Sequence, residues 1–276
     1  MQKFRTSDDS LVGQVTLGTG VWSTMTISAD SRYAFVVDYL GSVAFVDLNT
    51  MELKTVYTGL NNPHGVSVSE DMKTLYVTAQ QGNYIYKIGI TDPYLPDINY
   101  VIIEKNAPLI MVSRLDPHQV DIAPNGTEYF VTCQKSNEVR VMSVAADTLI
   151  AVIPTGGDPQ EPEFSETTPY LFVTCMNDSL TNPGTVGSIS VINYVTHSFV
   201  KSIYTGWQPH GAGVDDDAGL VYVANRNVNE NGPAPHHSST CGGRNGYVTI
   251  IDMNTLELFP DYKVEVSVDP YEVGVR

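Results

Sequence analysis

The feature that most constrains the fold of this chain is an internal repeat. The stretch YTGWQPHG that begins at Tyr204 returns almost unchanged as YTGLNNPHG at Tyr57, and the Pro-His pair appears a third time at Pro117. A period of roughly 20 to 50 residues is typical of solenoids, propellers and other arrays of small units. We therefore expect similar structural units to follow one another along the chain.

Each repeat can be aligned on the residue that opens it, which is proline in all but the first. These anchors lie 41, 54, 42, 50 and 61 residues apart. A shortest unit of about 42 residues suits four short antiparallel strands, the size of one propeller blade, and the longer spacings indicate insertions. The anchors are Trp22, Pro63, Pro117, Pro159, Pro209 and Pro270.

The same strands and turns follow the anchors. Turn sequences such as APNG at Ala123 and DDDA at Asp215 stand at a fixed offset after a short alternating strand. A second strand then reads LYVTAQ, YFVTCQ, LFVTCM or VYVANR, and its aromatic and β-branched residues favour a buried strand. Two distant units end in nearly the same third strand, FVDLNTMEL at Phe45 and IIDMNTLEL at Ile250. We predict an all-β fold, a single β-propeller domain over residues 1–276 with four-stranded antiparallel blades.

The number of blades and their closure are predicted from the anchors and the two ends of the sequence. Six anchors predict six blades, with seven in a longer parent as the alternative. Residues 1–20 look like the third and fourth strands of a blade, and PYEVGVR, from Pro270, looks like a first strand. Joining them would close the ring with strands from both ends. The second strand of that blade is then unaccounted for, so either the blade has three strands or an upstream part of the natural protein is missing.

The units resemble those of YVTN-type β-propeller proteins, whose blades run roughly as Pro-His-Gly, an apolar strand, an Asp-Gly turn, Tyr-Val-Thr-Asn, Gly-Ser-Val and Ile-Asp-x-x-Thr. The resemblance covers nearly the whole chain and implies the propeller fold. The matching segments are YVTA at Tyr76, FVTC at Phe130 and Phe172, YVAN at Tyr222, GSVAFVDLNT at Gly41 and GSISVIN at Gly187.

The resemblance implies less about function than about fold, because this family includes surface proteins, binding modules and relatives of several enzyme classes. It leads us to expect a periplasmic, cell-surface or secreted protein. Two departures from the pattern stand out. Gln160 and Glu161 replace the usual His-Gly pair, and cysteine replaces the expected asparagine at Cys133 and Cys175.

Charge and hydropathy exclude several classes of partner. The chain has 31 acidic and 15 basic residues and a net charge of −16. Nucleic acids and anionic membrane surfaces are bound through basic patches, so we expect neither as a partner. The sequence has no apolar run of roughly 18 residues, which predicts no transmembrane segment. Its first residues lack the apolar core of a signal peptide.

Residues that are far apart in the sequence lie together on one face of a propeller. The first strand of every blade begins on the same face, so the residues after the anchors are expected to ring the mouth of the central channel. Histidines there could bind a metal or a polar ligand, or they could bond the backbone of a neighbouring blade; both interpretations stay open. The predicted ligand-binding residues are His64, His118, Gln160, Glu161, His210, Tyr271 and Glu272.

A long insertion, residues 226–246, separates the second and third strands of the fifth unit. A loop of this length without strand or helix pattern is usually functional or disordered. It contains His236, His237 and Cys241. Imidazole and thiolate are ligands that zinc and copper prefer, so these residues form a candidate metal site, although the spacing matches no strong ligand signature. A disulfide and packed histidines are the alternative.

Three cysteines cannot all pair within the chain. Cys133 and Cys175 end second strands of consecutive units, where a disulfide would require too short a Cα separation, so we expect no bond between them. Either could be a buried small hydrophobe. A bond between Cys175 and Cys241 is the remaining alternative.

Enzyme motifs are few in this sequence. It contains no GxSxG, HExxH, GxxxxGK or GxGxxG. The favoured function is a binding or interaction module whose His/Cys-rich face takes a small-molecule ligand or a protein partner. A metal- or haem-dependent redox propeller, similar to those of nitrite and nitrous oxide reductases, is the second hypothesis. A lactonase- or lyase-type enzyme with Glu161 and Glu272 as acid or base is the third.

Overall fold

The structure is a computed structural model that describes residues 1–18, 20, 22–90, 97–102, 115–179, 187–227 and 245–275. Every regular element among them is a β-strand. The described part of the chain has no helix that could cross a lipid bilayer. The chain divides into two compact units, the first comprising residues 1–122 and 144–147, the second residues 123–143 and 148–276. We describe each unit by itself.

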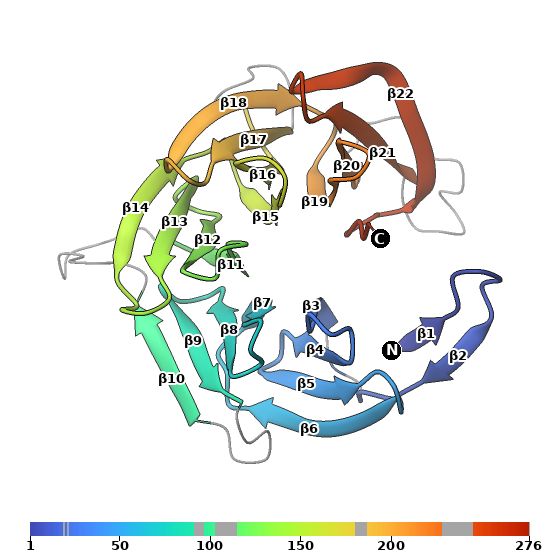
Figure 1. The fold of residues 1–276 in the computed structure, drawn as a ribbon, viewed down its shortest axis with the longest axis vertical. Coiled ribbons are helices and arrows are strands. Elements are labelled where there is room, and N and C mark those ends of the chain that lie inside the picture. Colours follow the sequence, from blue (N-terminus) through green and yellow to red (C-terminus); the bar gives the residue numbers. More distant parts are fainter. Residues whose placement is uncertain are drawn as a thin grey trace. The chain divides into compact units, whose positions relative to one another are not determined.

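The first unit contains two four-stranded antiparallel sheets, β3-β4-β5-β6 and β7-β8-β9-β10, together with the hairpin β1-β2 and the strand β11 (Figure 1). In each four-stranded sheet the strands lie side by side in chain order. The strands are β1 (Gln2–Phe4), β2 (Leu11–Gln14), β3 (Trp22–Ile27), β4 (Tyr33–Asp38), β5 (Ser42–Asp47), β6 (Glu52–Thr58), β7 (Pro63–Val68), β8 (Thr74–Ala79), β9 (Tyr84–Gly89), β10 (Asp97–Ile102) and β11 (Pro117–Ile122).

The second unit contains the antiparallel strands β12, β13 and β14 and two complete four-stranded sheets, β15-β16-β17-β18 and β19-β20-β21-β22. Its strand order repeats that of the first unit. The strands are β12 (Glu128–Cys133), β13 (Glu138–Ser143), β14 (Leu149–Pro154), β15 (Pro159–Phe164), β16 (Tyr170–Cys175), β17 (Ser188–Asn193), β18 (Ser198–Tyr204), β19 (Pro209–Asp215), β20 (Leu220–Asn225), β21 (Asn245–Asp252) and β22 (Glu257–Val268).

The buried cores lie between facing sheets, and the second strands supply much of them. β8, β12 and β16 share the same burial pattern, five buried residues after one that is half-buried. In the first unit, Phe35 of β4 packs in one cluster with Val66 of β7 and Val77 of β8. In the second unit, Phe172 of β16 packs with Val221 of β20. The aromatic and β-branched residues of the repeat therefore form the core, as the sequence predicted.

The turns at fixed offset also form as predicted. In four of them one residue adopts positive φ: Ser31 at 57°, Met72 at 57°, Gly126 at 68° and Gly219 at 70°. Serine side chains close two of them, because Ser28 and Ser69 donate to aspartates two residues later.

The first strands β3, β7, β15 and β19 each carry a β-bulge directly after the anchor residue. On β7, Pro63 pairs with Ala79 and the next pair is Val66 with Val77, so two residues of β7 lie opposite one of β8. The same shift occurs after Pro159, Pro209 and Trp22. A bulge bends the strand and redirects side chains. His64, Gln160, Glu161 and His210 of the predicted ligand site therefore lie at the bulges.

The two ends of the chain differ in how well they match the prediction. Residues 1–20 supply two paired strands, β1 and β2, as expected. Residues 270–275 carry no strand assignment, which corrects the first strand expected there. The segment packs face to face on β19, since a Cβ at Gly211 would lie 2.6 Å from Glu272 Cα. No described strand of the second unit pairs with residues 270–275, so this segment is not part of a sheet within that unit.

Candidate functional site

In the first unit, two of the predicted histidines come together. His64 is the second residue of β7 and His118 the second of β11, and both are buried, with 6% and 3% of their surface exposed. Their ring centroids lie 3.9 Å apart with the planes inclined by 34°. One ring nitrogen of each lies within 4.8 Å of the other. We call these two residues the His64–His118 pair.

Neighbouring side chains orient the pair. The Gln80 amide nitrogen lies 3.3 Å from Nδ1 of His118, and the Tyr39 ring stands edge-on to the His64 ring at 6.4 Å between centroids. An amide beside one imidazole nitrogen orients the ring and directs the other nitrogen. Gln80 and Tyr39 both follow second strands, at the end of the sheet where the first strands begin.

Burial keeps His64 neutral at ordinary pH. It lowers the pKa of His64 to about 4, and a hydrogen bond with the His118 backbone opposes this shift. A neutral imidazole has a nitrogen lone pair, which is the form that coordinates a metal. The pair could therefore hold a metal ion of the type that prefers nitrogen ligands.

A threonine hydroxyl connects each of these first strands to the preceding sheet. Thr78 of β8 accepts from the Gly65 amide at 2.7 Å, which the bulge has taken out of the ladder, and donates to the His118 carbonyl at 2.8 Å. Thr24 of β3 donates to the His64 carbonyl at 2.6 Å. These buried bonds fix the backbone that carries both imidazoles.

The second unit repeats this connection. Thr132 donates to the Gln160 carbonyl at 2.6 Å, and Thr174 donates to the His210 carbonyl at 2.5 Å. Thr174 also accepts from the Glu161 amide at 3.0 Å. Thr78 and Thr174 thus each satisfy a bulge amide in their own sheet, and all three threonines satisfy a carbonyl of the next first strand.

Five predicted site residues lie in the second unit. Gln160, Glu161 and His210 are buried, with at most 2% of their surface exposed, and Tyr271 is half-buried. Nδ1 of His210 lies 3.1 Å from the Tyr271 carbonyl oxygen, and the two rings are 3.6 Å apart between centroids. His64 thus bonds the backbone of His118 and His210 the backbone of Tyr271, as one of the two interpretations required.

Glu161 and Glu272 differ in exposure. Burial, and next the negative charge of Glu161, raise the pKa of Tyr271 well above its ordinary value. Loss of hydration around the Glu272 carboxyl raises its pKa to about 7. The Glu161 residue is 2% exposed, whereas Glu272 is an exposed residue.

An ion pair secures the segment that carries Tyr271. Arg226 contacts both carboxylate oxygens of Asp269, at 2.5 and 3.1 Å, and its guanidinium lies 5.3 Å from the centre of the Tyr271 ring. Bidentate pairs of this kind are geometrically specific. We call Arg226 and Asp269 the C-terminal latch.

The remaining predicted residues are cysteines and the loop histidines. Cys133 and Cys175 are buried, and no disulfide joins them to each other, as the sequence predicted. Burial raises the pKa of the Cys175 thiol to about 12. His236, His237 and Cys241 lie outside the described residues, so the predicted loop metal site stays a prediction.

Sequence reasoning missed several residues that build these sites. Gln119 contributes the polar side chain beside Gly65: an added Cβ there would lie 1.9 Å from Gln119 Oε1. Gln80, Tyr39 and Arg226 were also not singled out. The position of Gln119 in its repeat could have identified it, since Glu161 and Glu272 occupy the same place in theirs.

The sequence matches no protein-family model and no curated protein. Solved structures do resemble it. Hydrazine synthase of Kuenenia stuttgartiensis, which contains a β-propeller, is 17% identical with a TM-score of 0.68, over 92% of this chain and 70% of that one. A functionally unknown protein from Desulfotomaculum acetoxidans DSM 771 is 11% identical with a TM-score of 0.69, over 98% of this chain and 81% of that one.

The fold is a β-propeller. The four-stranded antiparallel sheets are its blades, in agreement with the predicted fold class. At these identities the resemblance concerns the fold alone, and a propeller hosts many unrelated functions. Function has to be argued from the side chains of this chain.

Proposed function

We propose that this chain is a metal-binding β-propeller of the YVTN type, which works outside the cytoplasm as a binding module. The observation that carries the proposal is the His64–His118 pair, two buried imidazoles with ring nitrogens within 4.8 Å of each other. Two neutral imidazoles this close together can each present a nitrogen to one ion. The ligand we propose for them is a zinc or copper ion.

Two features support assignment to the YVTN type. The signature segments recur in four units of the sequence. The threonine of the signature also has one physical role wherever it occurs in the described blades, because Thr78, Thr132 and Thr174 each donate to the carbonyl of a residue that follows an anchor. A periplasmic or cell-surface location belongs to the same proposal and rests on the resemblance.

The chemistry of the donors favours zinc or copper over calcium or magnesium. Imidazole nitrogen suits zinc and copper, whereas calcium and magnesium prefer oxygen ligands. Gln80 would act on His118 in the way that outer partners orient metal-bound histidines, by fixing the ring nitrogen that faces away from the ion. Since an amide can present either its oxygen or its nitrogen, Gln80 can serve either tautomer.

The test is a calorimetric titration of tag-free protein with zinc and, separately, with copper. We expect one tight equivalent per chain, lost in His64→Gln and in His118→Gln. His197→Gln is the matched control, because His197 pairs with Glu128 at 2.9 Å in the second unit and removing it leaves the His64–His118 pair intact. Unchanged binding in His64→Gln and His118→Gln would refute the proposed site.

The loop histidines need a separate arm in the same experiment. A His236→Ala and His237→Ala double variant should retain the tight equivalent that we assign to His64 and His118. If that equivalent disappears in the double variant and persists in His64→Gln, the metal belongs to the insertion loop instead. If no protein takes up metal, the histidines serve only to connect neighbouring first strands.

A redox function is the second candidate, and the same pair favours it, because imidazole ligands hold copper in both of its common oxidation states. Reversible reduction of the copper-loaded protein, lost in His118→Gln, would support this function. The lactonase or lyase hypothesis rests on Glu161 and Glu272, for which no described geometry yet provides a substrate position.

A further inference from the structure

The turn that precedes β12 contains a short acceptor pattern for a covalent modification. Asn125, Gly126 and Thr127 read Asn-x-Thr, in which x is not proline. Sugars are attached to the side-chain nitrogen of asparagine in this pattern, in surface loops of secreted proteins. Because so short a pattern also occurs by chance, the geometry of the turn decides whether it can be used.

The Asn125 side chain bonds the turn through its oxygen and not through its nitrogen. Residues 124–127 are all exposed. The backbone amide and the hydroxyl of Thr127 each donate to Asn125 Oδ1 at 2.9 Å. A backbone N–H can only donate, so the atom that it meets must be the amide oxygen. Within the described part of the chain, the Asn125 Nδ2 atom makes no hydrogen bond. The nitrogen that would carry a sugar is therefore not used by the turn.

The equivalent turns of the first unit show that the turn itself needs no amide nitrogen. Asp30 and Asp71 occupy the place of Asn125, and each accepts from the backbone amide two residues later, at 3.1 Å. The residue between has positive φ in all three turns. A carboxylate oxygen thus fills the structural role of the Asn125 oxygen. Asn125 and Thr127 stand where the other two turns have aspartate and a basic residue, Arg32 or Lys73, and these two differences create the acceptor pattern.

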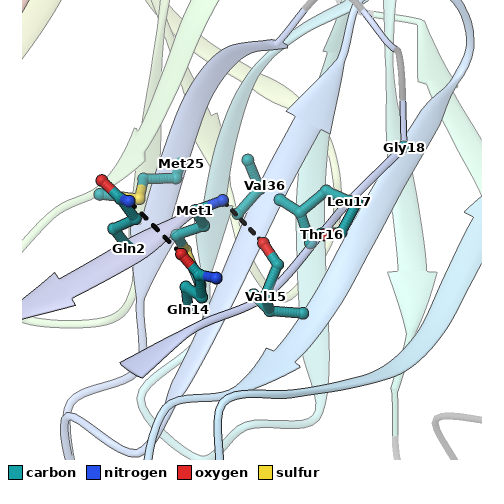
Figure 2. A pocket seen from close by; sticks show the side chains of 9 residues that line it. All are labelled: Met1, Gln2, Gln14, Val15, Thr16, Leu17, Gly18, Met25 and Val36. Carbon is teal, nitrogen blue, oxygen red and sulfur yellow. Dashed lines mark hydrogen bonds between the residues drawn. The ribbon is translucent and has the colours of Figure 1, made fainter. Parts of the chain in front are cut away.

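The hairpin β1-β2 shows exposed carboxamides of the opposite kind. In Figure 2 the Gln2 amide nitrogen points to the Gln14 amide oxygen, 3.5 Å away, and the Met1 α-ammonium donates to the Val15 carbonyl at 2.9 Å. The polar groups of this hairpin bond one another, and neither glutamine belongs to an acceptor pattern. Asn125 has both an unused amide nitrogen and a hydroxyl two residues later.

We propose that Asn125 is a site of N-linked glycosylation. Nδ2 forms a bond to the anomeric carbon of an oligosaccharide, and the bond between that carbon and the phosphate of a lipid-linked diphosphate donor breaks. The phosphate leaves with the electron pair of that bond, and the amide gives one proton to a base of the transferase. The Thr127 hydroxyl, bonded to Oδ1, orients the carboxamide for this step. The inference rests on the location outside the cytoplasm that belongs to the proposed function.

The test is cell-free translation of the full chain, fused to a secretory signal sequence, in the presence of microsomes. Every version carries Asn177→Gln, which removes the other acceptor pattern of the chain, Asn-Asp-Ser. We expect a mass increase that endoglycosidase H removes. Asn125→Asp and Thr127→Lys, which restore the residues of the equivalent turns, should each abolish it. Thr127→Ser is the matched control and should retain it, because serine keeps the hydroxyl.

The second arm transfers the site and separates it from a structural role. Asp71→Asn combined with Lys73→Thr should add a second glycan, in the turn of the first unit. Asn125→Asp should leave the thermal midpoint of glycan-free protein unchanged, because Asp30 and Asp71 make the same turn bond. The proposal is overturned if no glycan is attached or if Asn125→Asp retains it. Metal titration of glycan-free protein tests the proposed function separately, so either one can fail alone.

Discussion

The hydroxyl of Thr78 illustrates how one residue serves two blades. It accepts from the Gly65 amide and donates to the His118 carbonyl, both buried. The first blade lacks a threonine at the matching place, which Val37 occupies, and supplies Thr24 from its first strand instead. In the fifth repeat the place is taken by Ala224. The signature threonine therefore has a structural role that can be tested singly.

Replacing Thr78 by valine keeps the shape and removes the hydroxyl, which leaves the Gly65 amide without this acceptor and His118 without this donor. A buried group that loses its partner costs about 1 to 3 kcal/mol. We expect the free energy of unfolding to fall by about 2 kcal/mol, measured by urea denaturation. Thr196→Val, at an exposed turn, is the control and should change it by less than about 0.5 kcal/mol. Equal effects would contradict this role.

Gly211 is required for a different reason, close approach. A Cβ at this position would lie 2.6 Å from both the Cα of Glu272 and the carbonyl oxygen of Tyr271, which are main-chain atoms that cannot turn aside. Gly211→Ala should therefore lower the thermal midpoint, with a loss of about 1 to 3 kcal/mol as in other overpacked sites. Gly274→Ala is the matched control, because nothing lies within 4 Å of its Cβ position. A neutral Gly211→Ala would show that the segment does not pack on β19.

At the scale of elements, the β-bulge explains both what the sequence predicted and what it did not. The repeat predicted the strands and the residues that follow each anchor. It did not predict the β-bulge in the backbone there. Hydrophobic periodicity indicates which face of the sheet a residue lies on, but it does not indicate one extra residue in a strand pairing. His64 lies at the bulge of β7 and its ring contacts that of His118, and no sequence pattern encodes that contact.

The segment 270–275 shows a second limit of sequence reasoning. Its alternating residues predicted a strand, yet a strand requires a hydrogen-bonded neighbour as well as a pattern. The segment is instead held by side chains: the C-terminal latch, and the stacking of Tyr271 on His210. Arg226 and Asp269 are 43 residues apart in the sequence, so the pairing had no local signal.

Loss of the C-terminal latch should release that segment. In Arg226→Met the bidentate contact to Asp269 disappears while much of the packing volume remains. We expect faster amide hydrogen exchange in residues 270–275 than in the unaltered protein, with exchange in β20 unchanged, measured by mass spectrometry. Arg5→Met is the control, because the Arg5–Asp8 pair is exposed and lies in the first unit. Unchanged exchange would mean that aromatic stacking alone holds the segment.

At the scale of the whole molecule, the fold followed from the repeat, whereas the function has to be argued from a few side chains. Composition and spacing predicted four-stranded blades because each blade must bury the same apolar faces. The predicted site residues divide between the two units: His64 and His118 lie in the first, and Gln160, Glu161, His210, Tyr271 and Glu272 lie in the second. The contacts within each unit show which of these residues bond the backbone of a neighbouring segment.

The central claim is that His64 and His118 together hold a zinc or copper ion. The most direct measurement is anomalous diffraction at the zinc and copper edges, from crystals of tag-free protein grown with each metal. The account predicts an anomalous peak about 2.0 to 2.1 Å from one ring nitrogen of each histidine. Metal-loaded crystals with no peak between these two rings, or with the peak at the loop that carries His236 and His237, would contradict it.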